Sequence, residues 1–82
     1  MQGQVTEIKP RGVIATIDGT PEVGDLFQVY RIQNGIEVIL ATGYVRKQRE
    51  NGYKINPIDG EDGSRGAPFI GVEVGDLVRK IV

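Results

Sequence analysis

The sequence predicts an all-β domain, a small closed or nearly closed barrel of six or seven mostly antiparallel strands. The pentapeptide Glu-Val-Gly-Asp-Leu occurs at Glu22–Leu26 and again at Glu73–Leu77, Asn-Gly pairs separate strand-like segments, and no window has helical periodicity. Glycine permits a sharp corner between strands, and a following aspartate can accept hydrogen bonds from backbone N–H groups there. The residues assigned to these two structural turns are Gly24, Asp25, Gly75 and Asp76.

Strand-like segments fill the first half of the chain. Gln4–Lys9 and Gly12–Asp18 are predicted strands, and a third, Leu26–Ile32, follows the first corner. Asn34-Gly35 then predicts a tight hairpin, because both residues tolerate a positive φ. The returning strand is predicted to run over Ile36–Arg49, so the hairpin should be long.

The second half continues the β pattern with one clear loop. Gly43, inside the long strand, predicts a β-bulge or a sharp bend. The later segments are a turn at Asn51-Gly52, a strand over Tyr53–Ile58, a polar loop over Asp59–Gly66, a resumed apolar segment over Ala67–Val72 and a last strand over Leu77–Val82. The residues that flank the two pentapeptides do not match, so we interpret the repeat as a recurring turn requirement rather than an internal duplication.

Size and composition limit the function classes. The 82 residues are predicted to form one domain, 1–82, excised from a longer protein, because strand-like sequence reaches the last residue. Cysteine and histidine are both absent, which removes disulfides, thiolate metal sites and the commonest general base. The net charge of −1 argues against nucleic acid as a main partner. No apolar run approaches the roughly 20 residues that span a bilayer, so we expect no membrane insertion.

The order of the motifs carries a family resemblance. Gly3-Gln4-Val5 opens a strand, Val23–Arg31 supplies a corner and a strand, Ala41–Val45 follows the hairpin, and Val74–Val78 closes the chain. This succession, with its Gly-Asp corners or GD boxes, resembles the C-terminal β-barrel domain of the flagellar assembly protein T family, a barrel of the cradle-loop type. The resemblance implies attachment to a periplasmic, envelope-associated protein that helps to build the ring around a bacterial flagellar motor. Absence of cysteine fits the periplasm and the cytoplasm alike.

Acidic and glycine-rich groups are the first candidates for chemistry. Asp25 and Asp76 could act as paired carboxylates, but each is expected to cap its own turn. Asp59, Glu61 and Asp62 could hold calcium, yet their spacing does not fit the twelve-residue calcium loop. The same loop is rich in glycine, but it has neither the lysine nor the following helix of a phosphate-binding loop. We therefore predict no catalytic, metal-binding or cofactor-binding residue, no cofactor, and a protein that is not an enzyme.

Aromatic and basic residues are the candidates for binding. Phe27, Tyr30 and Phe69 would anchor a protein partner if they are exposed, because interfaces favour aromatic side chains. Strand alternation places residues 44 and 46 on one face and 47 and 49 on the other, which splits the only basic group. The residues that would contact nucleic acid are Tyr44, Arg46, Lys47, Arg49 and Tyr53.

These observations leave three functions open. The first is a non-catalytic accessory module that supports protein–protein assembly, with another protein or another domain of its parent chain as partner. The alternative is a nucleic-acid- or translation-associated barrel that binds through the basic residues. A third is an engineered or reconstructed scaffold without natural activity. Fold analogy does not choose among them, and the oligomeric state stays open.

Overall fold

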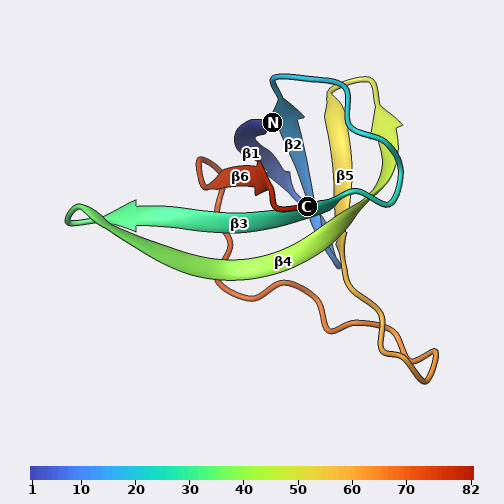
Figure 1. Ribbon diagram of the computed structural model, residues 1–82. Coiled ribbons are helices and arrows are strands. Elements are labelled where there is room, and N and C mark those ends of the chain that lie inside the picture. The colour runs from blue at the N-terminus through green and yellow to red at the C-terminus, as the bar shows by residue number, and fades with distance from the viewer.

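Six antiparallel strands close into a barrel in the computed structural model, which describes residues 1–82 and contains no helix. Around the barrel the strand order is β1-β2-β5-β4-β3-β6 (Figure 1). The strands are β1 Gln2–Ile8, β2 Val13–Ile17, β3 Leu26–Gln33, β4 Ile36–Arg49, β5 Gly52–Pro57 and β6 Leu77–Lys80. The predicted all-β barrel is confirmed.

The apolar segment after the polar loop is irregular. Residues 67–72 form no strand, although Phe69 N–H donates to the Arg11 carbonyl at 3.1 Å. Pro68 has no N–H to give to a ladder, which disfavours regular pairing there. The segment instead crosses the barrel as an irregular connection between β5 and β6 (Figure 1).

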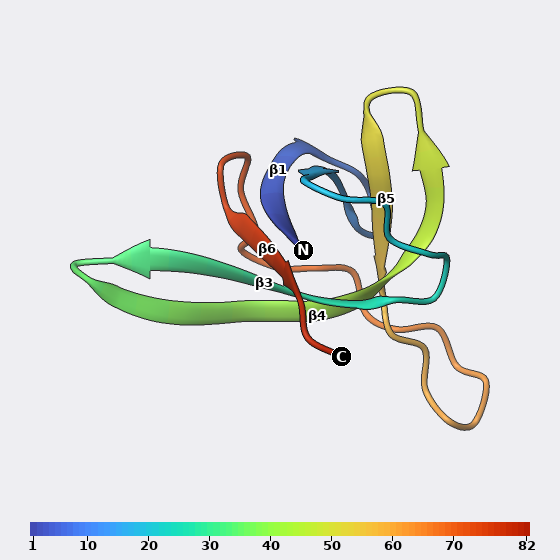
Figure 2. The same ribbon diagram turned by 45° about the horizontal axis from the view of Figure 1, so that its top comes forward.

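A long hairpin projects beyond the barrel. Asn34 and Gly35 have φ values of 53° and 79°, as the tight turn requires. β3 pairs with β6 only as far as Tyr30, and β4 pairs with β5 only from Gly43 onward. Residues 31–42 therefore pair only within the β3–β4 hairpin, and we call them the hairpin arm. Both views show the arm extending away from the other strands (Figures 1 and 2).

The core lies inside the barrel and takes one side chain in two from each strand. Its fully buried members are Val5, Val13, Ala15, Phe27, Val29, Val45, Ile55 and Val78, with Tyr53 at 8% exposure. β6 buries Val78 rather than Leu77, and Ile81 is 40% exposed. Because side chains alternate with a period of two, a strand of four residues carries too little pattern to reveal its inner face.

The predicted position of the bulge, at Gly43, is wrong. Gly43 pairs regularly with both Phe27 and Pro57. A Cβ there would overlap the Asn56 carbonyl oxygen and lie 2.8 Å from Cζ of Phe69, so the glycine permits the close approach of these groups. The register shift on the β5 side falls between Val45 and Lys47, and a matching shift in β1 falls between Val5 and Glu7.

The barrel has an internal two-fold relation. Exchanging β1, β2 and β3 for β4, β5 and β6 leaves the strand order unchanged. The registers agree as well, because Val5 faces Ala15 as Val45 faces Ile55, and the extra residue after each valine bulges outward. The pair Ile14–Lys54 maps onto itself and marks the axis on the β2–β5 side.

Equivalent positions also share residue types. Gly3-Gln4-Val5 corresponds to Gly43-Tyr44-Val45, and the first pentapeptide corresponds to the second. The sequence shift between halves is constant through β1 and β2, then grows by an insertion that contains the polar loop. The pairing scheme of the whole half repeats, so the interpretation of the pentapeptide as a local turn requirement is too narrow.

Replacing Gly24 with valine should lower the free energy of unfolding by about 1–2 kcal/mol, because a β-branched residue is strained at positive φ. Gly24 has φ 96°, and a Cβ added there would meet nothing within 4 Å, so strain rather than steric overlap would cause the loss. Urea unfolding measures it. Gly24→Asn is the control, since asparagine tolerates this region, and an equal loss in both variants would contradict the explanation.

Candidate functional site

The two Gly-Asp corners share one hydrogen-bonding scheme. Gly24 N–H donates to the Val45 carbonyl and Val45 N–H donates to the Asp25 carbonyl, at 2.8 and 2.9 Å. Gly75 and Asp76 make the same pair of bonds with Val5, at 2.9 and 2.8 Å. Gly75, like Gly24, has a positive φ, of 98°. Each corner is thus bound to the valine that precedes a bulge.

The carboxylates of the corners have different surroundings. Asp25 Oδ2 accepts only the N–H of Glu22, at 2.9 Å. Asp76 accepts the N–H of Glu73 at 2.7 Å and also two N–H donors of Arg31, at 2.7 and 2.8 Å. The side chains of Asp25 and Asp76 therefore serve separate turns rather than one acid–base site. The structure contains no group of three acidic residues that could hold a metal ion.

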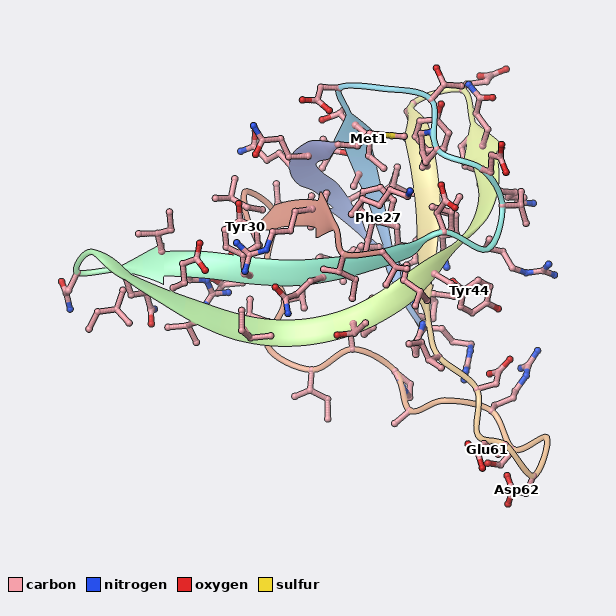
Figure 3. All side chains as sticks on the ribbon, in the orientation of Figure 1. Met1, Phe27, Tyr30, Tyr44, Glu61 and Asp62 are labelled. Atoms are coloured by element: carbon pink, nitrogen blue, oxygen red, sulfur yellow. The ribbon has the colours of Figure 1, made fainter.

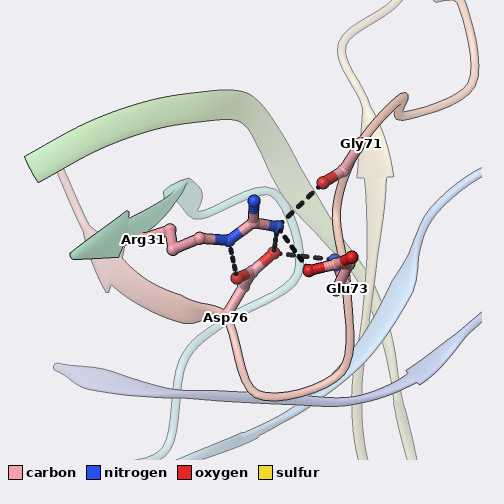
Figure 4. A network of polar contacts seen from close by, with 4 residues as sticks. All are labelled: Arg31, Gly71, Glu73 and Asp76. Carbon is pink, nitrogen blue, oxygen red and sulfur yellow. Dashed lines mark hydrogen bonds and ion pairs between the residues drawn. The ribbon is translucent and has the colours of Figure 1, made fainter. Parts of the chain in front are cut away.

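Arg31 links the start of the hairpin arm to the second corner (Figure 4). Besides its fork on Asp76, it donates to the Gly71 carbonyl at 2.9 Å and lies 3.2 Å from a Glu73 carboxylate oxygen. Asp76 is only 4% exposed, so this carboxylate depends on its donors to replace water. The clasp fixes the direction in which the arm leaves the barrel.

The clasp changes the titration of its members. The hydrogen bonds from Arg31 hold the pKa of the Asp76 carboxyl below its ordinary value, against the opposing effect of burial, and the Glu73 N–H lowers it further. The same bonds raise the pKa of Arg31. A folded pKa below the unfolded one means that the carboxylate stabilises the fold above pH 3.8 and that this contribution is lost as pH falls through the folded pKa.

The aromatic residues predicted as partner anchors lie mostly inside. Phe27 is fully buried in the core, which removes the exposure that a binding role requires (Figure 3). Tyr30 is 8% exposed and lies under Arg79, whose guanidinium carbon is 4.2 Å from the ring centroid. Phe69 is half-buried and packs against the core. Tyr53, predicted to contact nucleic acid, is also a core residue.

The basic residues of β4 are brought to one face, contrary to the predicted split. The register shift after Val45 pairs Lys47 with Lys54, while Tyr44 pairs with Asn56. Lys54 and Asn56 are two positions apart on β5 and point to the same side, so Tyr44 and Lys47 share the outer face. The extra residue in one strand cancels the alternation that strict periodicity assumes. Figure 3 shows Tyr44 pointing away from the barrel.

Residues far apart in the sequence complete this surface, which we call the cationic face. Its basic residues are Lys9, Arg11, Arg46, Lys47, Arg49, Lys54 and Arg65. Burial is the main cause that lowers the pKa of the Lys54 ammonium. The nearby positive charges of Arg49, Lys9, Arg11 and Arg46 lower this pKa further. The β1–β2 turn thus adds two cations to those of β4. The sequence offered no signal for Lys9, Arg11, Lys54 or Arg65, because the barrel order that places β2 beside β5 is not readable from local pattern.

A small polar hollow opens on the cationic face. It has a volume of about 280 Å³ and is lined by Arg11, Tyr44, Arg46, Asn56, Pro57, Asp59 and Arg65. Arg11 also donates to the Gly66 carbonyl at 2.5 Å, and Asp59 accepts the Gly66 N–H at 3.0 Å. These two side chains hold the end of the polar loop against the barrel, and the loop brings Arg65 to the hollow.

The acidic residues of the polar loop stabilise the loop itself. Asp62 Oδ1 accepts the N–H of Ser64 at 3.0 Å, and hydrogen bonds from Ser64 lower the pKa of Asp62. Glu61 and Asp62 lie at the loop tip, at the far end from the hairpin turn (Figure 3). The arrangement is that of a capped turn rather than a set of converging ligands.

No known family model, curated protein or solved structure matches the chain. The structure has no helix that is long and apolar enough to cross a membrane. Two surfaces of the protein, the hairpin arm and the cationic face, are the candidates for binding.

Asp76→Asn should lower the free energy of unfolding by about 2 kcal/mol at pH 7, since hydrogen bonds to charged groups contribute about 1.5–3 kcal/mol. Asp25→Asn should cost less, because its carboxylate accepts one backbone N–H. Urea unfolding at pH 7 and below pH 3.8 measures both. The gap between wild type and Asp76→Asn should narrow in acid, and a constant gap would contradict the assignment of stabilisation to the ionised carboxylate.

Proposed function

We propose that this domain is a non-catalytic assembly module that binds a protein partner through its hairpin arm. One observation carries the proposal: the arm projects from the barrel (Figure 1) and carries several exposed apolar side chains. A small domain exposes single apolar residues routinely, but a group of them on one projecting element is typical of an interaction site.

Apolar residues occupy both faces of the arm. Ile36 is 67% exposed, Ile32 is 56% exposed and Ile39 is 50% exposed. Ile32 pairs with Glu37 and Tyr30 pairs with Ile39, so Ile32 and Ile39 are diagonal neighbours on one face. Ile36 pairs with Gln33 on the opposite face. A partner that covers the arm would remove apolar surface from water on both sides, which favours association.

The edges of the arm are also free. No backbone hydrogen bond reaches residues 31–42 from outside the β3–β4 hairpin. An open strand edge presents unpaired N–H and C=O groups to which a partner can add a strand. The β4 side from Ile36 to Thr42 is the longer of the two open edges. We expect the partner to pair along this edge and to cover Ile36 or Ile39.

The resemblance to the flagellar assembly protein T family suggests the class of partner. It directs the proposal to a protein of a bacterial envelope assembly, and to the periplasm as its location. The clasp of Arg31 on Asp76 supports such a role, because a rigid base lets the arm meet a partner without first being ordered.

The test is to immobilise the domain, pass purified flagellar basal bodies and bacterial envelope extract over it, and identify the retained protein. That protein, once purified, is titrated against wild type, Ile36→Lys and Ile39→Lys by calorimetry. Each variant should weaken binding about tenfold or more, since burying an unpaired ammonium is costly.

Val23→Lys is the matched control, because Val23 is 71% exposed and lies at the first corner, which is bonded to Val45 outside the arm. It should leave the affinity unchanged, and all variants should unfold at the wild-type urea concentration. Failure of every envelope component to bind would overturn the proposal. An equal loss in Val23→Lys would show that the arm is not the contact.

A further inference from the structure

Positive charge without a partner is confined almost entirely to the cationic face. Of the ten lysines and arginines, only Lys9, Arg31 and Arg79 form ion pairs with carboxylates. Among the others, Lys80 on β6 is the one that lies elsewhere. The unpaired members of the cationic face are Arg11, Arg46, Lys47, Arg49, Lys54 and Arg65. The net charge of −1 therefore conceals a strongly positive side.

The two-fold relation supplies an internal comparison for these charges. Arg46 and Lys47 occupy the positions that Thr6 and Glu7 occupy in the first half. Glu7 is neutralised by Lys9 at 2.7 Å, and its pKa is lowered chiefly by that contact. The same backbone is thus built without a cation at either position. The backbone of this bulge therefore does not depend on a cation at either position, and two like charges next to each other repel.

We infer that the cationic face binds the backbone of single-stranded nucleic acid, with one phosphate held in the hollow. Three guanidinium groups, those of Arg11, Arg46 and Arg65, line that hollow. A guanidinium presents a planar fork of donors that matches two phosphate oxygens, which an ammonium cannot do. One carboxylate, that of Asp59, also lines the hollow and accepts the Gly66 N–H, and the three arginines leave the hollow positively charged despite it.

The cations continue beyond the hollow as a line. Lys54 pairs with Lys47, and Arg49 follows two residues later on the same side of β4. Alternate residues of a strand are about 6.6 Å apart, so the line offers charges at regular intervals. A linear polymer with one negative charge per unit suits such a line better than an isolated anion does.

Tyr44 and the shape of the hollow favour a single strand over a duplex. The Tyr44 ring lines the hollow and is half-buried, which gives a base a fixed aromatic surface on which to stack. The hollow, of about 280 Å³, has room for a phosphate with its sugar, and the bases of a duplex are already stacked and offer Tyr44 no free face. An acidic peptide shares the charge but lacks both the stacking base and the tetrahedral oxygens.

The experiment is a titration of labelled mixed-sequence oligonucleotides of DNA and RNA against the domain, followed by fluorescence anisotropy at several salt concentrations. Binding should weaken steeply with salt, with a slope of log K against log salt of roughly −0.7 for each phosphate neutralised. Lys47→Glu copies the residue of the first half, so the variant should fold, and it should weaken binding at least tenfold and flatten the slope.

Lys80→Glu makes the same change of charge away from the cationic face and should change affinity by less than about twofold. The arm variant Ile36→Lys should also bind as wild type does, which separates this inference from the proposed assembly role. Polyglutamate of equal length is the competing ligand and should bind more weakly. The inference is overturned by the absence of saturable binding, by polyglutamate binding as tightly, or by an equal loss in Lys80→Glu.

Discussion

The corner bonds to Val5 and Val45 are the constraint on which the rest of the structure depends. Each corner gives one N–H to a valine carbonyl and accepts another N–H from the same valine, so the pairing of β3 with β4 and of β6 with β1 begins at the corner itself. The extra residue after each valine then bulges outward and increases the local twist, which closure of so few strands requires. Glycine at positive φ makes the corner possible, and the aspartate carboxylate satisfies the N–H groups that the turn leaves unpaired.

A nearly two-fold scaffold carries two unlike surfaces because the halves differ where the fold does not constrain them. The hairpin arm lies at the junction of the halves and has no equivalent, so its length and side chains are free to vary. Arg31, its first residue, is the place where arm and scaffold meet, through the buried Asp76. The cationic face arises from the second bulge, where Arg46 and Lys47 replace Thr6 and Glu7. The base of the arm is held by the Arg31 clasp, and the central part of the cationic face lies on the paired strands β4 and β5.

Some features of the fold follow from the local sequence, and others do not. The hairpin at Asn34-Gly35 and the bounds of β4 follow from the sequence, because the Asn-Gly turns at both ends of that strand are local signals. Phe27 and Tyr53 could not be placed from their type, because an aromatic residue suits a core as well as an interface. The predicted division of the basic residues between two faces of β4 is wrong, because the bulge after Val45 reverses the alternation of side chains. The corner that is bonded to Val45 lies about twenty residues earlier in the sequence, so no local pattern reveals this bulge. The sequence does not reveal the repeat of the two halves, because the insertion at the polar loop changes the spacing between equivalent residues from β3 and β6 onward.

The sequence by itself determined the all-β class, the hairpin positions and the need for a corner at each Gly-Asp, since each depends on the φ preferences and alternation of neighbouring residues. Only the tertiary structure decided that β2 lies beside β5 and β3 beside β6, which closes the barrel. It also decided that Arg11, Arg46 and Arg65 line one hollow and that Arg31 finds Asp76. These contacts join residues many positions apart, and their formation depends on the free energy of the whole packed barrel rather than on any local preference.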